Sequence, residues 1–95
     1  MADPTILHSI ARLVPPGSRV LDLGCGDGAL LAHLRDARQC TGYGVEIDDA
    51  KVHACLKRGV NVLQLNLEDG LNMFGDDAFD AVSYTHLRAH ETSLH

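Results

Sequence analysis

The sequence predicts an α/β fold, a doubly wound parallel sheet that is truncated after about its fourth strand. Short apolar segments at 19–23, 43–47, 60–65 and 79–82 alternate with segments whose apolar residues recur at helical spacing. The first apolar segment also runs directly into a glycine-rich turn, 24–28, that opens a helix. Strands that alternate with helices in this way imply a parallel sheet with helices on both faces.

Residues 3–14 are predicted to form the first helix. Asp3 is a good N-cap, and Pro4 occupies the first helical position, where its missing N–H costs nothing. The segment Pro15-Pro16-Gly17 ends this helix and makes a turn before the first strand. The apolar residues of the helix fall on one face: Ile6, Leu7, Ile10, Leu13 and Val14.

The later helices are marked by their apolar faces and their caps. Asp48 or Asp49 can cap the helix that follows the second strand, and Gly59 can end it. A short helix or turn is predicted after the third strand, through Leu71 and Phe74. The helix that follows the glycine turn carries its leucines on one face: Leu30, Leu31 and Leu34.

The glycine turn indicates a ligand site at the carboxyl end of the first strand. The turn reads Gly24-Cys25-Gly26-Asp27-Gly28. Glycines let the backbone turn sharply and let a ligand approach the main chain closely. Glu46 lies about twenty residues further on, at the end of the second predicted strand, where a carboxylate can accept hydrogen bonds from ribose hydroxyls.

NAD and S-adenosylmethionine are the two candidate ligands. The dinucleotide fingerprint is G-x-G-x-x-G, and here the third glycine comes one residue early. Asp27 places an acid in the loop that would repel a pyrophosphate, whereas Asp22 is suited to a cationic ligand. Because S-adenosylmethionine carries an ammonium and a sulfonium group, the acidic residues favour it over NAD.

The segment VLDLGCGDG resembles motif I of the class I S-adenosylmethionine-dependent methyltransferases, and GYGVEID resembles their second-strand motif. The resemblance implies that Glu46 holds the ribose and that Ile47 packs on the adenine. Asn66 stands where the family usually has an aspartate that contacts the adenine amino group, and Leu67 would offer its backbone N–H. The cofactor-binding residues expected on this basis are Asp22, Gly24, Cys25, Gly26, Gly28, Glu46, Ile47, Asn66 and Leu67.

A narrower resemblance covers about residues 3–81. The phrases PPGSRVLDLGCGDG, GYGVEIDDA, RGVNV and DDAFD are similar to those of the MetW family of methionine-biosynthesis proteins. This resemblance implies a homoserine O-acyltransferase partner, which the protein supports in the acylation of homoserine. A methyltransferase of unknown acceptor is the alternative, and whether the protein is itself an enzyme stays open.

Composition excludes several other classes of function. A net charge of −5 argues against binding to a nucleic acid backbone, because no basic stripe exists to release counterions. No apolar run approaches the length that spans a bilayer, and no secretory signal is visible, so we expect a cytoplasmic protein without membrane contact. Three cysteines without a C-x-x-C pair argue against a disulfide framework and against a zinc knuckle.

The sequence changes character after residue 81. A buried parallel strand should continue with apolar residues, but 82–95 is polar and holds three of the six histidines. The segment VSYTHLRAHET resembles the translation of a transposase-based sequencing adapter. We therefore expect 1–81 to be the N-terminal half of a methyltransferase-like domain and 82–95 to be a non-native tail. On this interpretation the 95-residue chain alone is poorly stable and inactive.

Long-read sequencing of the source locus across codons 78–100 tests the origin of this tail. We expect the genomic sequence to diverge from the printed one at about codon 82. Genomic DNA that encodes the tail, with native sequence on both sides of it, would show the interpretation to be wrong.

Overall fold

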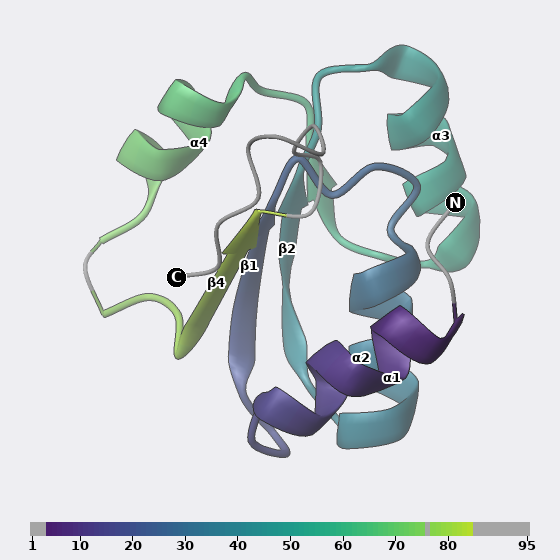
Figure 1. Ribbon diagram of the computed structural model, residues 1–95. Helices are drawn as coiled ribbons and strands as arrows, with labels where there is room; N and C mark the ends of the chain where they lie inside the picture. Colours follow the sequence, from purple (N-terminus) through teal and green to yellow (C-terminus); the bar gives the residue numbers. More distant parts are fainter. Residues whose placement is uncertain (1–3, 76, 85–95) are drawn as a thin grey trace.

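Four parallel strands in the order β3-β2-β1-β4 form one sheet. The computed structural model describes residues 4–75 and 77–84 of the chain (Figure 1). The strands are β1 (Arg19–Leu23), β2 (Thr41–Val45), β3 (Val62–Leu63) and β4 (Ala81–Tyr84). The predicted parallel α/β fold is confirmed, and β4 lies beside β1, so that the second and fourth strands flank the first.

Helices cover both faces of the sheet, as a doubly wound fold requires. The helices are α1 (Pro4–Leu13), α2 (Ala29–Arg38), α3 (Asp49–Arg58) and α4 (Leu67–Met73). Figure 1 shows α1, α2 and α3 on one face and α4 on the other. The hydrophobic core is divided into two buried clusters. One includes Val20 and Leu34, and the other includes Leu23 and Val45.

The predicted helix caps are mostly found where the sequence placed them. Asp48 is the N-cap of α3, and its carboxylate accepts a hydrogen bond from the Lys51 N–H at 3.0 Å. Gly59 ends the same helix in the left-handed conformation, with φ of 74°. Asp3, the N-cap predicted for α1, lies outside the described residues.

Three strands differ from their predicted bounds, and for two of them hydrogen bonds show why the strand ends early. β2 was expected over 43–47 but spans Thr41–Val45. It ends there because the Glu46 carboxylate accepts the next two backbone N–H groups and the chain turns. β3 was expected over 60–65 but has two residues, since the Leu65 N–H bonds to the Leu63 carbonyl within its own chain segment. β4 was expected over 79–82 and begins at Ala81.

The first residues of the predicted tail take part in the sheet. β4 continues through Ser83 and Tyr84, which pair in register with Asp22 and Leu23 of β1. Residues 85–95 lie outside the described part of the chain. The origin of the segment 82–95 stays a prediction.

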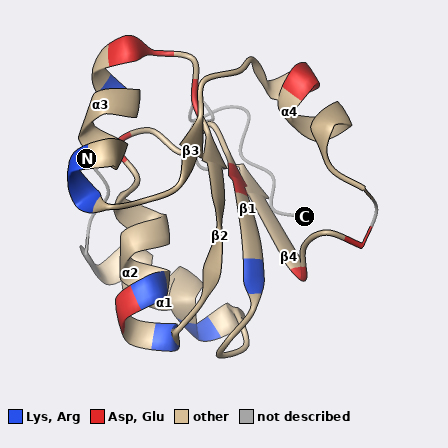
Figure 2. Cartoon of the chain, turned by 180° about the vertical axis from the view of Figure 1, so that it is seen from behind, with Lys and Arg blue, Asp and Glu red and all other residues tan. Residues whose placement is uncertain are grey.

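An ion pair joins the amino ends of β1 and β4. The Arg19 guanidinium donates to both carboxylate oxygens of Asp80, at 3.0 and 3.2 Å, and the Asp80 N–H donates to the Arg19 carbonyl. Figure 2 shows this basic segment of β1 beside the acidic segment that precedes β4. The hydrogen bonds from Arg19 hold the pKa of the Asp80 carboxyl below its usual value. Because both side chains are about half exposed, the pair fixes register more than it adds stability.

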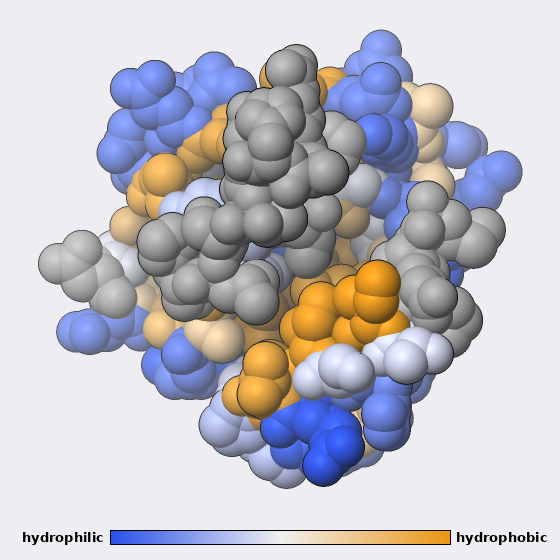
Figure 3. Space-filling model, viewed as in Figure 1, coloured by the Kyte–Doolittle hydropathy of each residue, from blue (hydrophilic) through white to orange (hydrophobic). Residues whose placement is uncertain are grey.

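Apolar side chains are also found on the surface of the described residues. Ile6 and Leu13 of α1 are 56% and 75% exposed. Figure 3 shows apolar side chains gathered over this helix.

Among the described residues, no helix is both long enough and apolar enough to cross a membrane.

Gly42 permits the close approach of β2 to β1. Its φ is 152°, and a Cβ atom at this position would collide with the backbone carbonyl of Val20. Because the obstacle is backbone within a paired strand, it cannot rotate away.

We expect Gly42→Ala to lower the free energy of unfolding by about 3 kcal/mol. Gly75→Ala is the matched control, since a Cβ there meets nothing within 4 Å, and it should cost less than about 0.5 kcal/mol. Urea unfolding with far-ultraviolet circular dichroism, in a stabilising osmolyte, measures both variants. Equal effects of the two substitutions would contradict the role given to Gly42.

Candidate cofactor site

Three consecutive backbone N–H groups of the glycine turn point toward the loop that follows β2. The N–H groups of Gly24 and Cys25 both donate to the Val45 carbonyl, at 2.7 and 3.0 Å. The Gly26 N–H donates to Oε1 of Glu46 at 2.9 Å. The glycines at 24, 26 and 28 all have positive φ, between 58° and 82°, which explains why glycine is needed at each.

Glu46 is the buried acid that joins the two loops. Glu46 is only 2% exposed. While Oε1 accepts the Gly26 N–H, Oε2 accepts the N–H groups of Ile47 and Asp48 at 3.1 and 3.0 Å. A carboxylate has about four acceptor positions, so three backbone amides leave one for a ligand hydroxyl. The predicted proximity of Glu46 to the glycine turn is therefore present, through a direct contact with Gly26.

Asp22 lies within the sheet, two residues before the turn. It is fully buried, and its Oδ1 accepts a hydrogen bond from the Ser83 hydroxyl at 2.8 Å. The sequence predicted Asp22 to face a cationic ligand, whereas the structure places the carboxylate inside the β1–β4 pair.

The other predicted contacts follow β2 and β3 at the same edge of the sheet. Ile47 is 62% exposed although it is apolar, and its carbonyl accepts a hydrogen bond from Gln64 at 3.1 Å. Asn66 caps α4, since its side-chain oxygen accepts the Asp69 N–H at 2.7 Å. Leu67 is the first residue of α4, so its N–H belongs to the first turn, which has no acceptor within the helix.

Asp27 in the turn is partly neutralised by a residue of α3. Its Oδ1 accepts the Ala29 N–H at 3.1 Å, and its Oδ2 lies 3.3 Å from the Arg58 guanidinium. The repulsion of a pyrophosphate expected from this acid is correspondingly weaker than the sequence suggested.

Two buried thiols lie behind the turn. The sulfur atoms of Cys25 and Cys55 are 3.7 Å apart, and the Cys55 thiol donates to the Gly26 carbonyl at 3.1 Å. Burial raises the pKa of both thiols, so neither is an activated nucleophile. A Cβ on Gly28 would approach Cys55 Sγ to 3.0 Å, so this glycine allows close packing against α3 as well as the left-handed turn.

Sequence reasoning missed Gly44, which makes room for the turn. A Cβ at this position in β2 would collide with the Cys25 side chain. The available signal was an isolated glycine inside a strand, which often marks a close approach of another segment. Sequence reasoning also missed the contact of Cys55 with Cys25, because nothing in the sequence places Cys55 beside a residue 30 positions away.

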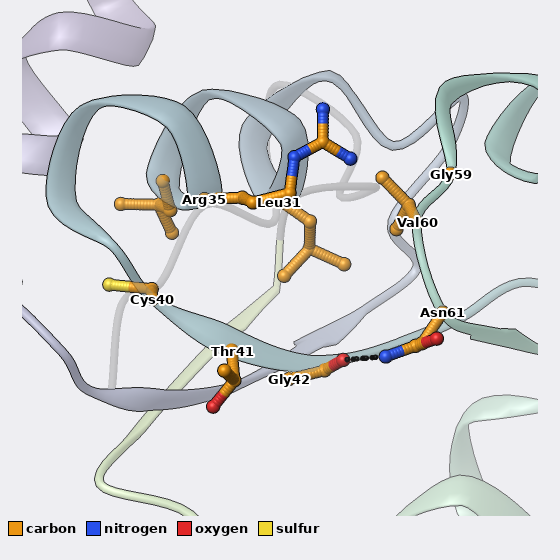
Figure 4. A pocket seen from close by; sticks show the side chains of 9 residues that line it. Leu31, Arg35, Cys40, Thr41, Gly42, Gly59, Val60 and Asn61 are labelled. Carbon is orange, nitrogen blue, oxygen red and sulfur yellow. Dashed lines mark hydrogen bonds between the residues drawn. The ribbon is translucent and has the colours of Figure 1, made fainter.

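A separate hollow of about 150 Å³ lies at the opposite edge of the sheet, near the start of β2. Figure 4 shows Arg35 and Leu31 of α2 above it and the hydrogen bond from Asn61 to the Gly42 carbonyl on its far side. None of the predicted site residues lines it. Within the described part of the chain, no group of three or more metal-ligating side chains is found.

A family model described as "Methionine biosynthesis protein MetW" matches residues 5–91, most of the chain. The chain belongs to the MetW family. It is 43% identical over 83 residues to a bifunctional methionine biosynthesis protein MetXA/MetW of Rhodopirellula baltica, an alignment that covers 79% of this chain and 13% of that protein. It is 32% identical over 87 residues to sterol 24-C-methyltransferase erg6 of Schizosaccharomyces pombe, covering 85% of this chain and 23% of the enzyme.

Solved structures show the same fold. A methyltransferase from Thiobacillus denitrificans, crystallised with S-adenosyl-L-homocysteine, matches 86% of this MetW-family chain with a TM-score of 0.73 at 21% identity. A second, from Geobacter sulfurreducens with the same compound, matches 86% with a TM-score of 0.64 at 27% identity. The chain spans 36% of each of these proteins.

Replacing Glu46 by glutamine should destabilise the fold even without a ligand. Whichever way the amide is oriented, its NH₂ group faces a backbone N–H that then has no acceptor, so we expect a loss of about 2 kcal/mol. Glu68→Gln, at an exposed acid in the first turn of α4, is the control and should cost less than about 0.5 kcal/mol. Urea unfolding measures both, and a stability of Glu46→Gln equal to that of the control would refute the bridging role.

Proposed function

We propose that the chain binds S-adenosylmethionine at the glycine turn. The observation that carries the proposal is the contact between the Gly26 N–H and the buried Glu46 carboxylate, which shapes a cradle at the carboxyl edge of the sheet. Ligands of open α/β sheets bind at this edge. The S-adenosyl-L-homocysteine in the methyltransferases from Thiobacillus denitrificans and Geobacter sulfurreducens supports the same ligand class.

The residues around the turn fit such a cofactor. A Cβ on Gly26 would meet nothing within 4 Å, so open space lies in front of the main chain where a ligand can approach. Glu46 retains an acceptor position for a ribose hydroxyl, and exposed Ile47 offers an apolar surface to an adenine ring. Asn66 and Leu67 begin α4 at the same edge and supply polar groups for the ring. When bound, S-adenosylmethionine supplies a methyl group on a positively charged sulfur.

We further propose that the protein acts in methionine biosynthesis together with a homoserine O-acyltransferase. Membership of the MetW family supports the pathway. The relative from Rhodopirellula baltica joins MetXA and MetW in one protein, and such a covalent link supports a physical partnership between two proteins of that pathway. Co-purification with the acyltransferase, and a gain in its activity on addition of the full-length protein, are the expected results.

Methyl transfer to an unidentified acceptor is the second candidate function. The similarity to sterol 24-C-methyltransferase and to methyltransferases crystallised with the demethylated cofactor favours it. A labelled methyl group that appears on an acceptor in a cell extract, in the absence of acyltransferase, would support this candidate over the partnership.

Gly26→Ala tests the cofactor site against a closely matched control. Both Gly26 and Gly17 have positive φ, and a Cβ on either meets no atom within 4 Å, so the two alanines impose similar backbone strain. Gly17 precedes β1, at the opposite edge of the sheet. We expect only Gly26→Ala to weaken binding of S-adenosylmethionine, by about tenfold or more, because its Cβ occupies the ligand's space.

Isothermal titration with S-adenosylmethionine, S-adenosylhomocysteine and NAD measures the effect, with the methyltransferase from Thiobacillus denitrificans, which was crystallised with S-adenosyl-L-homocysteine, as the positive control. Binding of NAD but not of S-adenosylmethionine would overturn the proposal. An equal loss of affinity in the Gly17 and Gly26 variants would show that the turn does not hold the cofactor.

A further inference from the structure

Cys25 and Cys55 come from different elements and meet behind the glycine turn. Cys25 lies in the turn after β1, and Cys55 lies in α3. Both are free thiols, 5% and 0% exposed, and their sulfur atoms are 3.7 Å apart. A disulfide bond is about 2.05 Å long, so the sulfurs need to approach by only about 1.7 Å.

The third cysteine is remote from this pair. Cys40 immediately precedes β2, whereas Cys25 lies in the turn at the other end of the neighbouring strand β1. A five-residue strand rises about 16 Å, which separates the two thiols by far more than a disulfide can span. Of the three possible pairs of cysteines, the fold therefore brings together one, and it is the pair most distant in sequence.

We propose that Cys25 and Cys55 form a site of reversible oxidation, at which a disulfide ties the glycine turn to α3. With oxidised glutathione as the oxidant, one thiol loses its proton and attacks the glutathione disulfide, which releases one reduced glutathione and leaves a mixed disulfide. The second thiol then loses its proton and displaces the second glutathione. Two protein thiols and one oxidised glutathione thus give one protein disulfide and two reduced glutathiones.

Oxidation changes the environment of the turn directly. The Cys55 thiol donates a hydrogen bond to the Gly26 carbonyl, and this donor is lost when the disulfide forms. The crosslink also restrains Cys25, whose N–H bonds to the Val45 carbonyl. Because burial raises the pKa of both thiols, closure requires a transient opening of the turn, and the disulfide is best detected at equilibrium. The inference rests on these contacts and needs no cofactor.

Peptide mapping of the 95-residue chain tests the proposal with an internal control. Trypsin cleaves after Arg19, Arg35, Arg38, Lys51 and Lys57, so each cysteine lies on its own peptide, 20–35, 39–51 or 52–57. The chain is equilibrated in a glutathione redox buffer, alkylated, digested and analysed by mass spectrometry. We expect the 25–55 disulfide to exceed the other two together by about tenfold.

The same experiment in guanidinium gives the opposite order for an unfolded chain. The pairs 25–40 and 40–55 each close a loop of about 15 residues, whereas 25–55 closes one of about 30, which loop entropy disfavours by about threefold. A native mixture with the same composition as the denatured one overturns the proposal.

Single-pair variants give a second measurement without competition between cysteines. Cys40→Ala leaves the pair 25–55, Cys55→Ala leaves 25–40, and Cys25→Ala leaves 40–55. The equilibrium constant for disulfide formation should be about tenfold higher in Cys40→Ala than in either other variant. Equal constants in the three variants would also overturn the proposal. Neither measurement involves S-adenosylmethionine, so a failure here is distinct from a failure of the proposed cofactor site.

Discussion

The buried carboxylate of Glu46 is the interaction on which the carboxyl edge of this sheet depends. The β1–β2 pairing ends at Leu23 and Val45, and in the described part of the chain no backbone pairing holds together the two segments that follow these strands. The Val45 carbonyl accepts two N–H groups of the turn, and the Glu46 side chain accepts the next one. Beyond the last strand residues, hydrogen bonds to this carboxylate therefore take the place of backbone pairing between the strands. Burying a charge is costly unless it is hydrogen-bonded, and three amides offset that cost with charge-assisted bonds. The loop after β1 and the loop after β2 consequently form one unit.

This arrangement places several demands on glycine at once. Successive N–H groups can converge on neighbouring acceptors only where the backbone enters the left-handed region, which Gly24 and Gly26 do. Gly28 and Gly44 meet a different requirement, because a Cβ on Gly44 would collide with the Cys25 side chain and a Cβ on Gly28 would crowd Cys55 Sγ. One face of the turn is therefore held by packing against β2 and α3, while the face at Gly26 remains open. A preorganised ligand site needs this combination of one face held rigid by packing and one face open to the ligand.

The sequence predicted those features whose signals are local. β1 has the bounds expected for it, because polar residues precede it and a glycine ends it, and the caps at Asp48 and Gly59 follow from residue types with known backbone preferences. The length of β3 was overestimated. Its apolar residues fit a longer strand, but hydrogen bonds within the segment shorten the part that pairs with β2. The proximity of Glu46 to the turn followed from strand order, but its three amide partners depend on tertiary geometry. The meeting of Cys25 and Cys55 has no local signal at all, because only the packing of α3 beside the turn creates it.

The ionisable side chains of the described site are engaged in contacts within the fold. Its two acids, Asp22 and Glu46, are both buried and hydrogen-bonded, one to a hydroxyl and the other to backbone amides, so neither is presented to an acceptor as a general base. Cys25 is not an activated nucleophile while the turn is closed, because burial raises the pKa of its thiol. Transfer of a methyl group from a sulfonium depends chiefly on holding donor and acceptor in line, and the proposed cofactor site would hold the donor. A protein that binds the cofactor in order to report or to stabilise a partner needs the same cradle. The difference between the two proposed functions would therefore lie in the surface that faces the turn, since the fold and the proposed cofactor site are common to both.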